Sequence, residues 1–324
     1  MLDSHAQDYV THLAATGPAR TAQHVSYVLT TFCRLIGRSA KTSISATADD
    51  LTDYRMALAT PAASVQNHTL APRTQAIHLA VVRGFFTWLR RRRLVFLDAA
   101  IHLVGPTISD RVVQKDFLTT QEAQALLATA ARRIEHKTPA TARWAIVWRD
   151  YALLALGLAS ARRVAGLCAT RSADLLIDAE RQELRVAFEK GHVGGHVPIS
   201  MWAAEILVEY QRVARPLIAG AAGSPYLFPS LLRNHVSEVQ ISHMLPKLIQ
   251  ETCRQHPDLV ELPKKHITMH SLRVTCAAML AANGCDLRVI QRVLLHRRIS
   301  TTAKYTPVLT DDLRTTLLTA HPRA

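Results

Sequence analysis

The sequence has few cysteines, and their arrangement suggests neither a disulfide framework nor a metal site. The five cysteines are odd in number and form no CxxC pair, which indicates reduced core thiols in a cytosolic protein. No apolar run is long enough to cross a membrane, so we expect no membrane association. The first ten residues, MLDSHAQDYV, lack the basic start and apolar core of a signal peptide. These absences predict a cytoplasmic protein.

Acidic residues are scarce relative to basic ones. The chain has 25 Asp+Glu against 39 Lys+Arg, a formal net charge of +14. Such a surplus favours a polyanionic partner, and nucleic acid is the commonest one. The pairs Asp49-Asp50 and Asp311-Asp312 occur where helices are expected to start, so they are interpreted as helix caps. A metal-dependent transposase or nuclease, which needs a carboxylate cluster, is therefore disfavoured.

The first hundred residues have the spacing of helices. Apolar residues recur at three- and four-residue steps over 25–36, a capped helix start follows at 48–51, and another helix runs from Thr74 to Trp88. That last helix ends in the run Arg90, Arg91, Arg92 and Arg93. The run suits a solvated helix end and also suits phosphate contact, and we favour DNA contact for at least one of the four.

The second half is also helical, with one change of period. Residues 105–116, which contain Gly105 and Pro106, predict a linker, so the expected domains are 1–104 and 117–324. Thr119 is expected to cap a helix that opens at 117–122. Apolar and polar residues alternate over 184–188 and 197–199 around the sequence GHVGG, which predicts a β-hairpin. The expected fold class is mainly α with a small β-sheet or hairpin: a helical N-terminal domain followed by a mixed α+β domain.

Six residues in short motifs of fixed order carry the chemistry of this half. They are Arg163 in ARRVAGL, Lys190 in FEKGHVGGHVPI, His270 and Arg273 in HSLR, His296 in LLHRR, and Tyr305 in TTAKYTPV. A metal-free attack on a DNA phosphate needs a nucleophile, fixed positive charge around the phosphorus, and an acid for the leaving oxygen. Arginine, lysine, histidine and a phenol supply these functions.

Each of the six has an ordinary structural interpretation when it is taken alone. Tyr305 could be a core residue, Lys190 a solvated turn lysine and His296 a helix C-cap. Arg162 competes with its neighbour Arg163. A zinc site at His266 and His270 is disfavoured, because no glutamate follows His266 and residues 267–269 have the pattern of extended chain.

The ordered set resembles the active-site signature of the tyrosine recombinases, the phage-integrase and Xer-like DNA strand-transfer enzymes. Further marks of the family are Arg149-Asp150 and the segment LFPS at 227–230. The N-terminal half resembles the family's SAM-like core-binding domain only in its helix pattern and its FFTWL-basic segment. The chain departs from the pattern at Leu295, where the family usually has glycine. It departs again at Val274, Gly166 and His196, which replace the family's usual histidine, acidic residue and hairpin arginine.

The resemblance implies a mechanism and its residues. Tyr305 would attack the scissile phosphate to form a 3′-phosphotyrosyl link, Lys190 would act as general acid, and Arg163, His270, Arg273 and His296 would stabilise the phosphate. Four protomers would exchange strands between two double-stranded DNA sites through a Holliday junction, without metal or cofactor, while associated with the nucleoid. Arg162, Arg297 and Arg298 are further expected DNA contacts. A second recombinase as partner stays open.

Several alternatives share parts of this pattern. A type IB topoisomerase uses the same chemistry as a monomer, although the helical N-terminal half and the helix expected over 310–324 argue against it. A catalytically inactive DNA-binding relative is disfavoured because all six positions are retained. Since no arm-binding domain is expected before residue 1, a Xer-like or simple transposon-type recombinase fits better than a lambda-type integrase. Whether the role is transposition, integration, inversion or dimer resolution is left open by the sequence.

Overall fold

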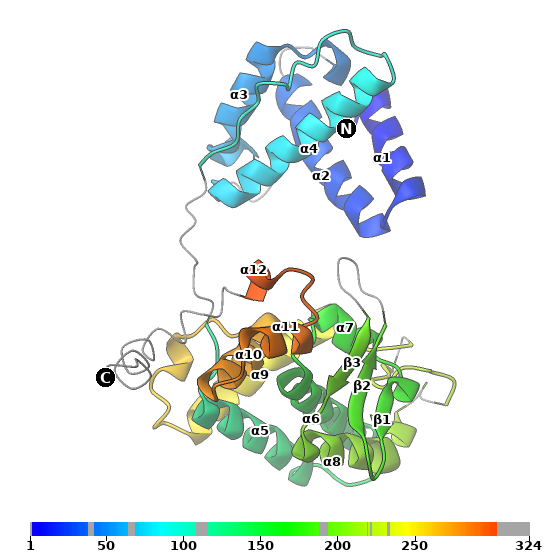
Figure 1. Cartoon of the computed structure of the whole chain (residues 1–324), viewed down its shortest axis with the longest axis vertical. Helices are drawn as coiled ribbons and strands as arrows, with labels where there is room; N and C mark the ends of the chain where they lie inside the picture. The colour runs from blue at the N-terminus through cyan, green and yellow to red at the C-terminus, as the bar shows by residue number, and fades with distance from the viewer. Residues whose placement is uncertain are drawn as a thin grey trace, which may run out of the picture. The chain divides into compact units, whose positions relative to one another are not determined.

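The chain forms two compact units, Met1–Arg111 and Val112–Ala324, here called unit 1 and unit 2. The computed structural model describes residues 2–37, 42–63, 69–107, 116–187, 194–218, 220, 222–231 and 234–302 (Figure 1). The expected linker, 105–116, contains the division between the units, and its residues 108–115 lie outside the described part.

The regular elements among the described residues of unit 1 are all helices. Its elements are α1 (Ser4–Thr16), α2 (Ala19–Ile36), η2 (Ser43–Ser45), α3 (Ala48–Leu58), η3 (Pro61–Ala63) and α4 (Pro72–Arg91). The three helices expected from the spacing are confirmed as α2, α3 and α4. Helix α4 starts two residues earlier than expected, because proline is well suited to the first turn. The helix start expected at 48–51 is capped, but the N-cap is Thr47 rather than Asp49 or Asp50, and Asp50 completes the capping box by accepting from the Thr47 amide.

Aromatic side chains fill the core of unit 1 and enclose one histidine. Phe32 packs edge-on against Tyr54 and Phe86, with ring centroids 5.1 Å and 6.2 Å away. His78 is 1% exposed, and its Nδ1 lies 3.0 Å from the Tyr54 hydroxyl. Burial, with a smaller contribution from the nearby His24, lowers the pKa of His78 to about 4. His78 is therefore a neutral member of the core at physiological pH.

Unit 2 contains helices and one small sheet. Its elements are α5 (Thr120–Glu135), α6 (Ala142–Ser160), α7 (Val164–Ala169), η4 (Ser172–Asp174), β1 (Leu175–Ile177), β2 (Gln182–Val186), β3 (Gly195–Pro198), α8 (Met201–Glu209), the π-turn η5 (Tyr210–Ala214), η6 (Arg215–Leu217), α9 (Glu238–Gln255), η7 (Leu262–Lys264), α10 (Met269–Ala282), α11 (Leu287–Val293) and α12 (Ile299–Thr302). The predicted fold class is confirmed. The expected cap at Thr119 is also present. None of the described helices is long and apolar enough to cross a membrane.

Helix α6 forms the centre of unit 2. Its residues from 152 to 158 are all buried, and α5, α8 and α10 pack around it. A helix that is apolar on all sides is stable only in such a core position. Gly157 lets α10 approach closely, since a Cβ at this position would stand 3.3 Å from Leu272 Cδ1. Helix α10, which carries HSLR, is thereby fixed directly against the core, and Figure 1 shows α11 beside it.

The sheet is antiparallel, with the strand order β1-β2-β3. Leu184 pairs with Val197 across β2 and β3, and both are buried, as the alternation predicted. The expected two-stranded hairpin is therefore part of a three-stranded sheet. Strand β1 was not predicted, because three consecutive apolar residues fit a helix and a strand equally well. Phe188 and Lys190 lie outside the described residues.

Candidate active site

Arg273 is the most deeply enclosed cation of unit 2 among the residues described. It lies in the second turn of α10 and is 1% exposed. Its Nη1 donates to the Ala161 carbonyl at 2.6 Å, and its Nη2 donates to the Leu294 carbonyl at 2.7 Å. The same Nη2 lies 2.8 Å from His296 Nε2. A buried charge is very costly unless it is hydrogen-bonded, so these contacts stabilise the guanidinium at this buried position.

Both carbonyl acceptors belong to helix ends with left-handed backbone. Ala161 follows α6 with φ +52°, and Leu295 follows α11 with φ +51°. At α11 the turn is a Schellman motif, in which the His296 amide bonds the Gln291 carbonyl and the Leu295 amide bonds the Arg292 carbonyl, each at 3.0 Å. Left-handed backbone costs about 1–2 kcal/mol outside glycine. Helix C-termini carry partial negative charge, so the contacts with Arg273 offset part of that cost.

His296 does more than cap a helix. Its backbone belongs to the end of α11, as the alternative interpretation required, but its ring is 7% exposed and points into the site. While Nε2 contacts Arg273, Nδ1 lies 2.9 Å from Thr302 Oγ1. The Gln291 side chain holds the His296 carbonyl at 2.8 Å. The ring is thus fixed from both sides, between α10 and α12.

Arg163 and His270 adjoin this pair. Arg163 is the N-cap residue of α7 and is half-buried. It follows Ala161 by two residues, so the hydrogen bond from Arg273 to Ala161 ties its segment to α10. His270 is half-buried one turn before Arg273 on the same helix. The fold therefore brings four of the six motif segments together, and Lys190 and Tyr305 lie outside the described residues.

The arginines expected to contact DNA differ in exposure. Arg90 to Arg93 are exposed at the end of α4, as are Arg297 and Arg298 after α11. Arg92 also lies over the Trp88 ring at 4.8 Å, so this guanidinium has a structural role at the helix end. Arg162 is only 3% exposed. A phosphate contact from Arg162 would need the groups that cover it to move, as would one from Arg273, which is 1% exposed.

The Arg149-Asp150 pair, noted above as a family feature, connects α6 with the segment 227–230. Arg149 is 6% exposed and donates from Nη1 to the Pro229 carbonyl at 3.1 Å, which joins α6 to the LFPS segment. Its Nη2 lies 2.8 Å from Asp150 Oδ1. Burial raises the pKa of the Asp150 carboxyl, and Arg149 opposes that rise. The contacts of Arg149 therefore join the two marks within the packing of unit 2.

The buried cysteines of α7 and α10 are poor nucleophiles because burial raises the pKa of their thiols. Cys276 lies one turn after Arg273, and burial raises the pKa of its thiol to about 11. Burial likewise raises the pKa of Cys168 to about 12. Because the thiolate is the reactive form, both stay unreactive near neutral pH. This agrees with the expected reduced core thiols, and all five cysteines are free.

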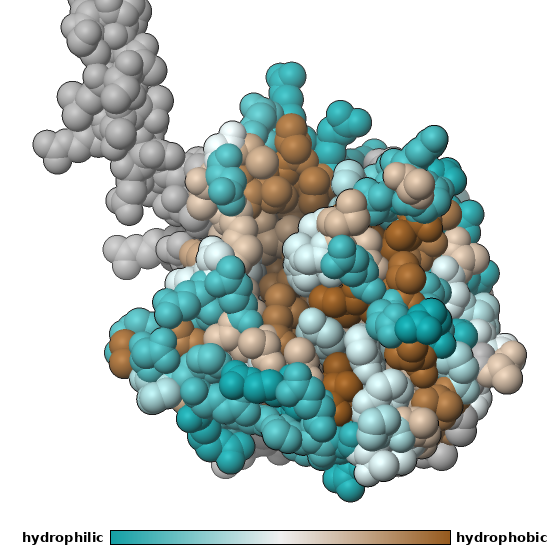
Figure 2. Space-filling view, turned by 90° about the horizontal axis from the view of Figure 1, so that it is seen from below, coloured by the Kyte–Doolittle hydropathy of each residue, from teal (hydrophilic) through white to brown (hydrophobic). Residues whose placement is uncertain are grey.

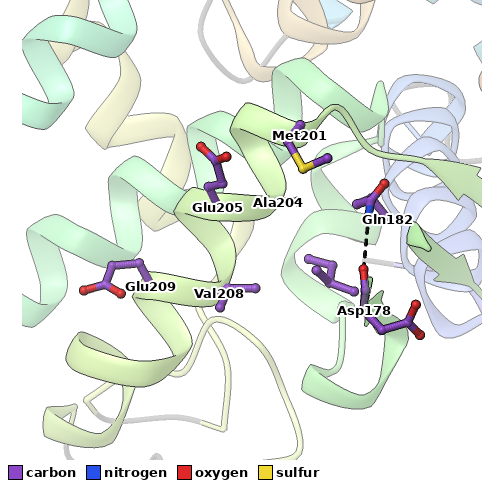
Figure 3. A pocket seen from close by; sticks show the side chains of 8 residues that line it. Asp178, Gln182, Met201, Ala204, Glu205, Val208 and Glu209 are labelled. Atoms are coloured by element: carbon purple, nitrogen blue, oxygen red, sulfur yellow. Dashed lines mark hydrogen bonds between the residues drawn. The ribbon is translucent and has the colours of Figure 1, made fainter. Parts of the chain in front are cut away.

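One groove of unit 2 has the wrong charge for DNA. It lies between the sheet and α8 and has a volume of about 320 Å³. Figure 3 shows the carboxylates of Glu205 and Glu209 projecting from α8 and that of Asp178 from the end of β1. Figure 2, seen from the side on which Figure 1 places α8, shows apolar patches separated by hydrophilic side chains. Three carboxylates disfavour a polyanion here, so this groove is separate from the cationic site. Within the described part of the chain, no three His, Cys, Asp or Glu side chains are grouped to hold a metal ion.

Comparison with known proteins assigns the chain to a family. The model of the phage integrase family matches residues 116–311, more than half of the chain. Tyrosine recombinase XerD of Pseudomonas putida is 30% identical over 254 residues, which cover 78% of this chain and 76% of the relative. Tyrosine recombinase XerC of Bacillus licheniformis is 28% identical over 257 residues, covering 79% and 77%. The chain therefore belongs to the phage integrase family and is a site-specific tyrosine recombinase, as its motifs predicted.

Solved structures agree on the fold. The crystal structure of the XerH site-specific recombinase bound to palindromic difH substrate matches with a TM-score of 0.68 at 14% identity, over 99% of this chain and 85% of that one. The Tn1549 transposon integrase in complex with circular intermediate DNA matches with a TM-score of 0.64 at 15% identity, over 93% and 94%. At this identity the match concerns the arrangement of elements rather than individual roles.

Proposed function

We propose that this recombinase cuts and rejoins double-stranded DNA at a specific site by metal-free transesterification through Tyr305. The observation that supports this most is the enclosed contact of Arg273 with His296, beside the segments of Arg163 and His270. Two backbone carbonyls and an imidazole are among the groups that hold Arg273 in place. A guanidinium stays charged at all ordinary pH values and can pair with the oxygens of a phosphate.

In the proposed step the Tyr305 phenol gives its proton to His270 as its oxygen attacks phosphorus, the bond from phosphorus to the 5′ oxygen breaks, and Lys190 gives that oxygen a proton. Arg163 and Arg273 hold the non-bridging oxygens, and His270 and His296 complete the stabilising set. The resulting 3′-phosphotyrosyl ester retains the bond energy. Attack by a 5′-hydroxyl of the partner strand then restores a phosphodiester and releases Tyr305 without ATP.

The proposed partner is a double-stranded recombination site. The XerH and Tn1549 integrase structures were solved in complex with DNA, which supports the same partner here. We assign DNA binding to the helical domain 1–104 and the chemistry to 117–324, joined by the linker 105–116. Five of the expected DNA contacts are exposed, so that phosphate oxygens can reach them without a rearrangement: Arg90, Arg91, Arg93, Arg297 and Arg298. Four copies on two sites would exchange strands through a Holliday junction.

Covalent trapping tests this proposal. Wild-type protein and Tyr305→Phe are incubated in EDTA with a nicked suicide duplex drawn from the DNA that flanks the gene. We expect a denaturation-resistant adduct with the wild type and none with Tyr305→Phe. A strict magnesium requirement for cleavage, or an adduct with both proteins, would contradict the scheme.

Two further outcomes separate the alternatives. Relaxation of a supercoiled plasmid that lacks the site would support topoisomerase-like activity. Binding of the flanking DNA without any adduct would support an inactive relative or one that needs a second recombinase.

A further inference from the structure

We propose that Thr302 is a positioning residue that accepts the Nδ1 proton of His296 and thereby holds its ring toward Arg273. Thr302 is the last residue of α12 and is 0% exposed. Its Oγ1 lies 2.9 Å from His296 Nδ1, while the other ring nitrogen lies 2.8 Å from Arg273 Nη2. Each ring nitrogen of His296 thus has a defined polar neighbour within a buried site.

The chemistry of the two neighbours determines where the proton lies. A guanidinium has five N–H donors and no acceptor. His296 Nε2 must therefore accept from Arg273 and can carry no hydrogen. In a neutral imidazole the proton then resides on Nδ1, where a hydroxyl can accept it. Thr302 Oγ1 is placed to be that acceptor.

Loss of the Thr302 hydroxyl would remove the hydrogen bond that holds the far side of the ring. The Nδ1–H of a buried ring would lose its acceptor, and the ring would be favoured to rotate toward another acceptor. Such a rotation breaks the contact with Arg273 that links α10 to the end of α11. Residues that orient a functional histidine through its second nitrogen typically change activity by about 10- to 100-fold. Thr302 also precedes Tyr305 by three residues, so the bond attaches the tyrosine-bearing segment to the cationic site through one ring.

The tautomer can be measured without DNA. Full-length protein labelled with ¹⁵N-histidine is examined by long-range ¹H–¹⁵N correlation, with His296→Gln used to assign the signal. We expect wild-type His296 and Thr302→Ser to be neutral with hydrogen on Nδ1, because serine keeps the hydroxyl. Thr302→Val, which has the same shape without an acceptor, should lose the slowly exchanging Nδ1–H signal that a buried, hydrogen-bonded proton gives. A wild-type ring with hydrogen on Nε2, or a charged ring at pH 8, would overturn the inference.

The functional part rests on the proposed DNA cleavage. We expect Thr302→Val to slow adduct formation about 10- to 100-fold at unchanged DNA affinity, with Thr302→Ser close to wild type. Thr252→Val is the matched control: Thr252 is 0% exposed in α9 and its hydroxyl bonds the Leu248 carbonyl at 2.9 Å. Wild-type cleavage by Thr302→Val would refute the positioning role. If even the wild type forms no adduct, the proposed function fails, but the ¹H–¹⁵N measurement of His296 still tests the positioning role independently.

Discussion

Replacing Arg273 by lysine separates charge from geometry at the site. The substitution keeps one positive charge at a position that is 1% exposed, but it removes the planar fork. Arg273 reaches three acceptors: the carbonyls of Ala161 and Leu294 and the ring of His296. A lysine has one nitrogen on a shorter reach, so it cannot face two helix ends and an imidazole together. At least one buried carbonyl should then lose its donor.

The expected loss follows from those contacts. A buried acceptor left without its partner costs about 1–3 kcal/mol. With one carbonyl and the ring nitrogen affected, we expect unit 2 to lose about 2–4 kcal/mol of unfolding free energy. Loss of one preorganised donor to the reacting phosphate should lower the cleavage rate by roughly 10²- to 10³-fold per folded molecule. Charge alone, if it were sufficient, would preserve the rate.

Urea unfolding and covalent trapping measure the two effects. Of the four tryptophans only Trp88 lies in unit 1, so fluorescence in a Trp88→Phe background reports on unit 2. Arg215→Lys is the matched control, since Arg215 Nη2 donates to the carbonyls of Ser224 and Tyr226 at 2.7 Å and 2.8 Å, away from the motif residues. It should lose some stability at an unchanged rate. An Arg273→Lys protein with wild-type stability or cleavage rate would refute the reasoning.

Three further predictions concern other parts of the chain. The pKa of His78 is about 4 in the fold against 6.5 in the unfolded chain, so folding favours the neutral ring. Unit 1 should therefore have its full unfolding free energy above about pH 6.5 and lose about 3 kcal/mol of it as the pH falls to 4. Hydrogen exchange of α2 to α4, corrected for intrinsic rate, should show this loss, and His78→Leu should remove the pH dependence. Ala161→Val should cost about 2 kcal/mol or more, because a β-branched residue fits φ +52° poorly, whereas Ala161→Gly should change urea stability by less than about 1 kcal/mol. If Lys190 is the general acid, Lys190→Ala should cleave poorly on normal DNA and recover on a duplex with sulfur at the bridging 5′ position, whose thiolate leaves without a proton; equal defects on both substrates would exclude that role.

Periodicity predicted most of the elements that place the site. The spacing at Val25 to Ile36 corresponds to α2, and the expected Thr119 cap opens α5, whereas α3 is capped by Thr47 rather than by the aspartates that were expected. Such features are local, because a helix face and its cap are set by residues within a few positions of one another. Strand β1 was missed because its three apolar residues have no distinguishing alternation, and its pairing with β2 is a property of the folded chain.

The motifs identified side chains of the site but not how the fold holds them. Two of the acceptors of Arg273 are backbone carbonyls 112 and 21 positions away, and any residue type supplies a carbonyl. Thr302 stands beside Tyr305 in the sequence, yet only the fold brings its hydroxyl to His296. Leu295 was noted as a departure from glycine, and its φ of +51° supplies the physical reason that glycine suits this position.

The central claim is that Tyr305 becomes covalently bound to a 3′ phosphate. Adduct formed in EDTA on a suicide duplex should be digested with protease and nuclease, and the nucleotide-bearing peptide sequenced by mass spectrometry. We predict a phosphoryl group on Tyr305, joined to the 3′ end of the cleaved strand, with a free 5′-hydroxyl on the released fragment. A modified peptide that contains another residue, or linkage through a 5′ phosphate, would contradict the account.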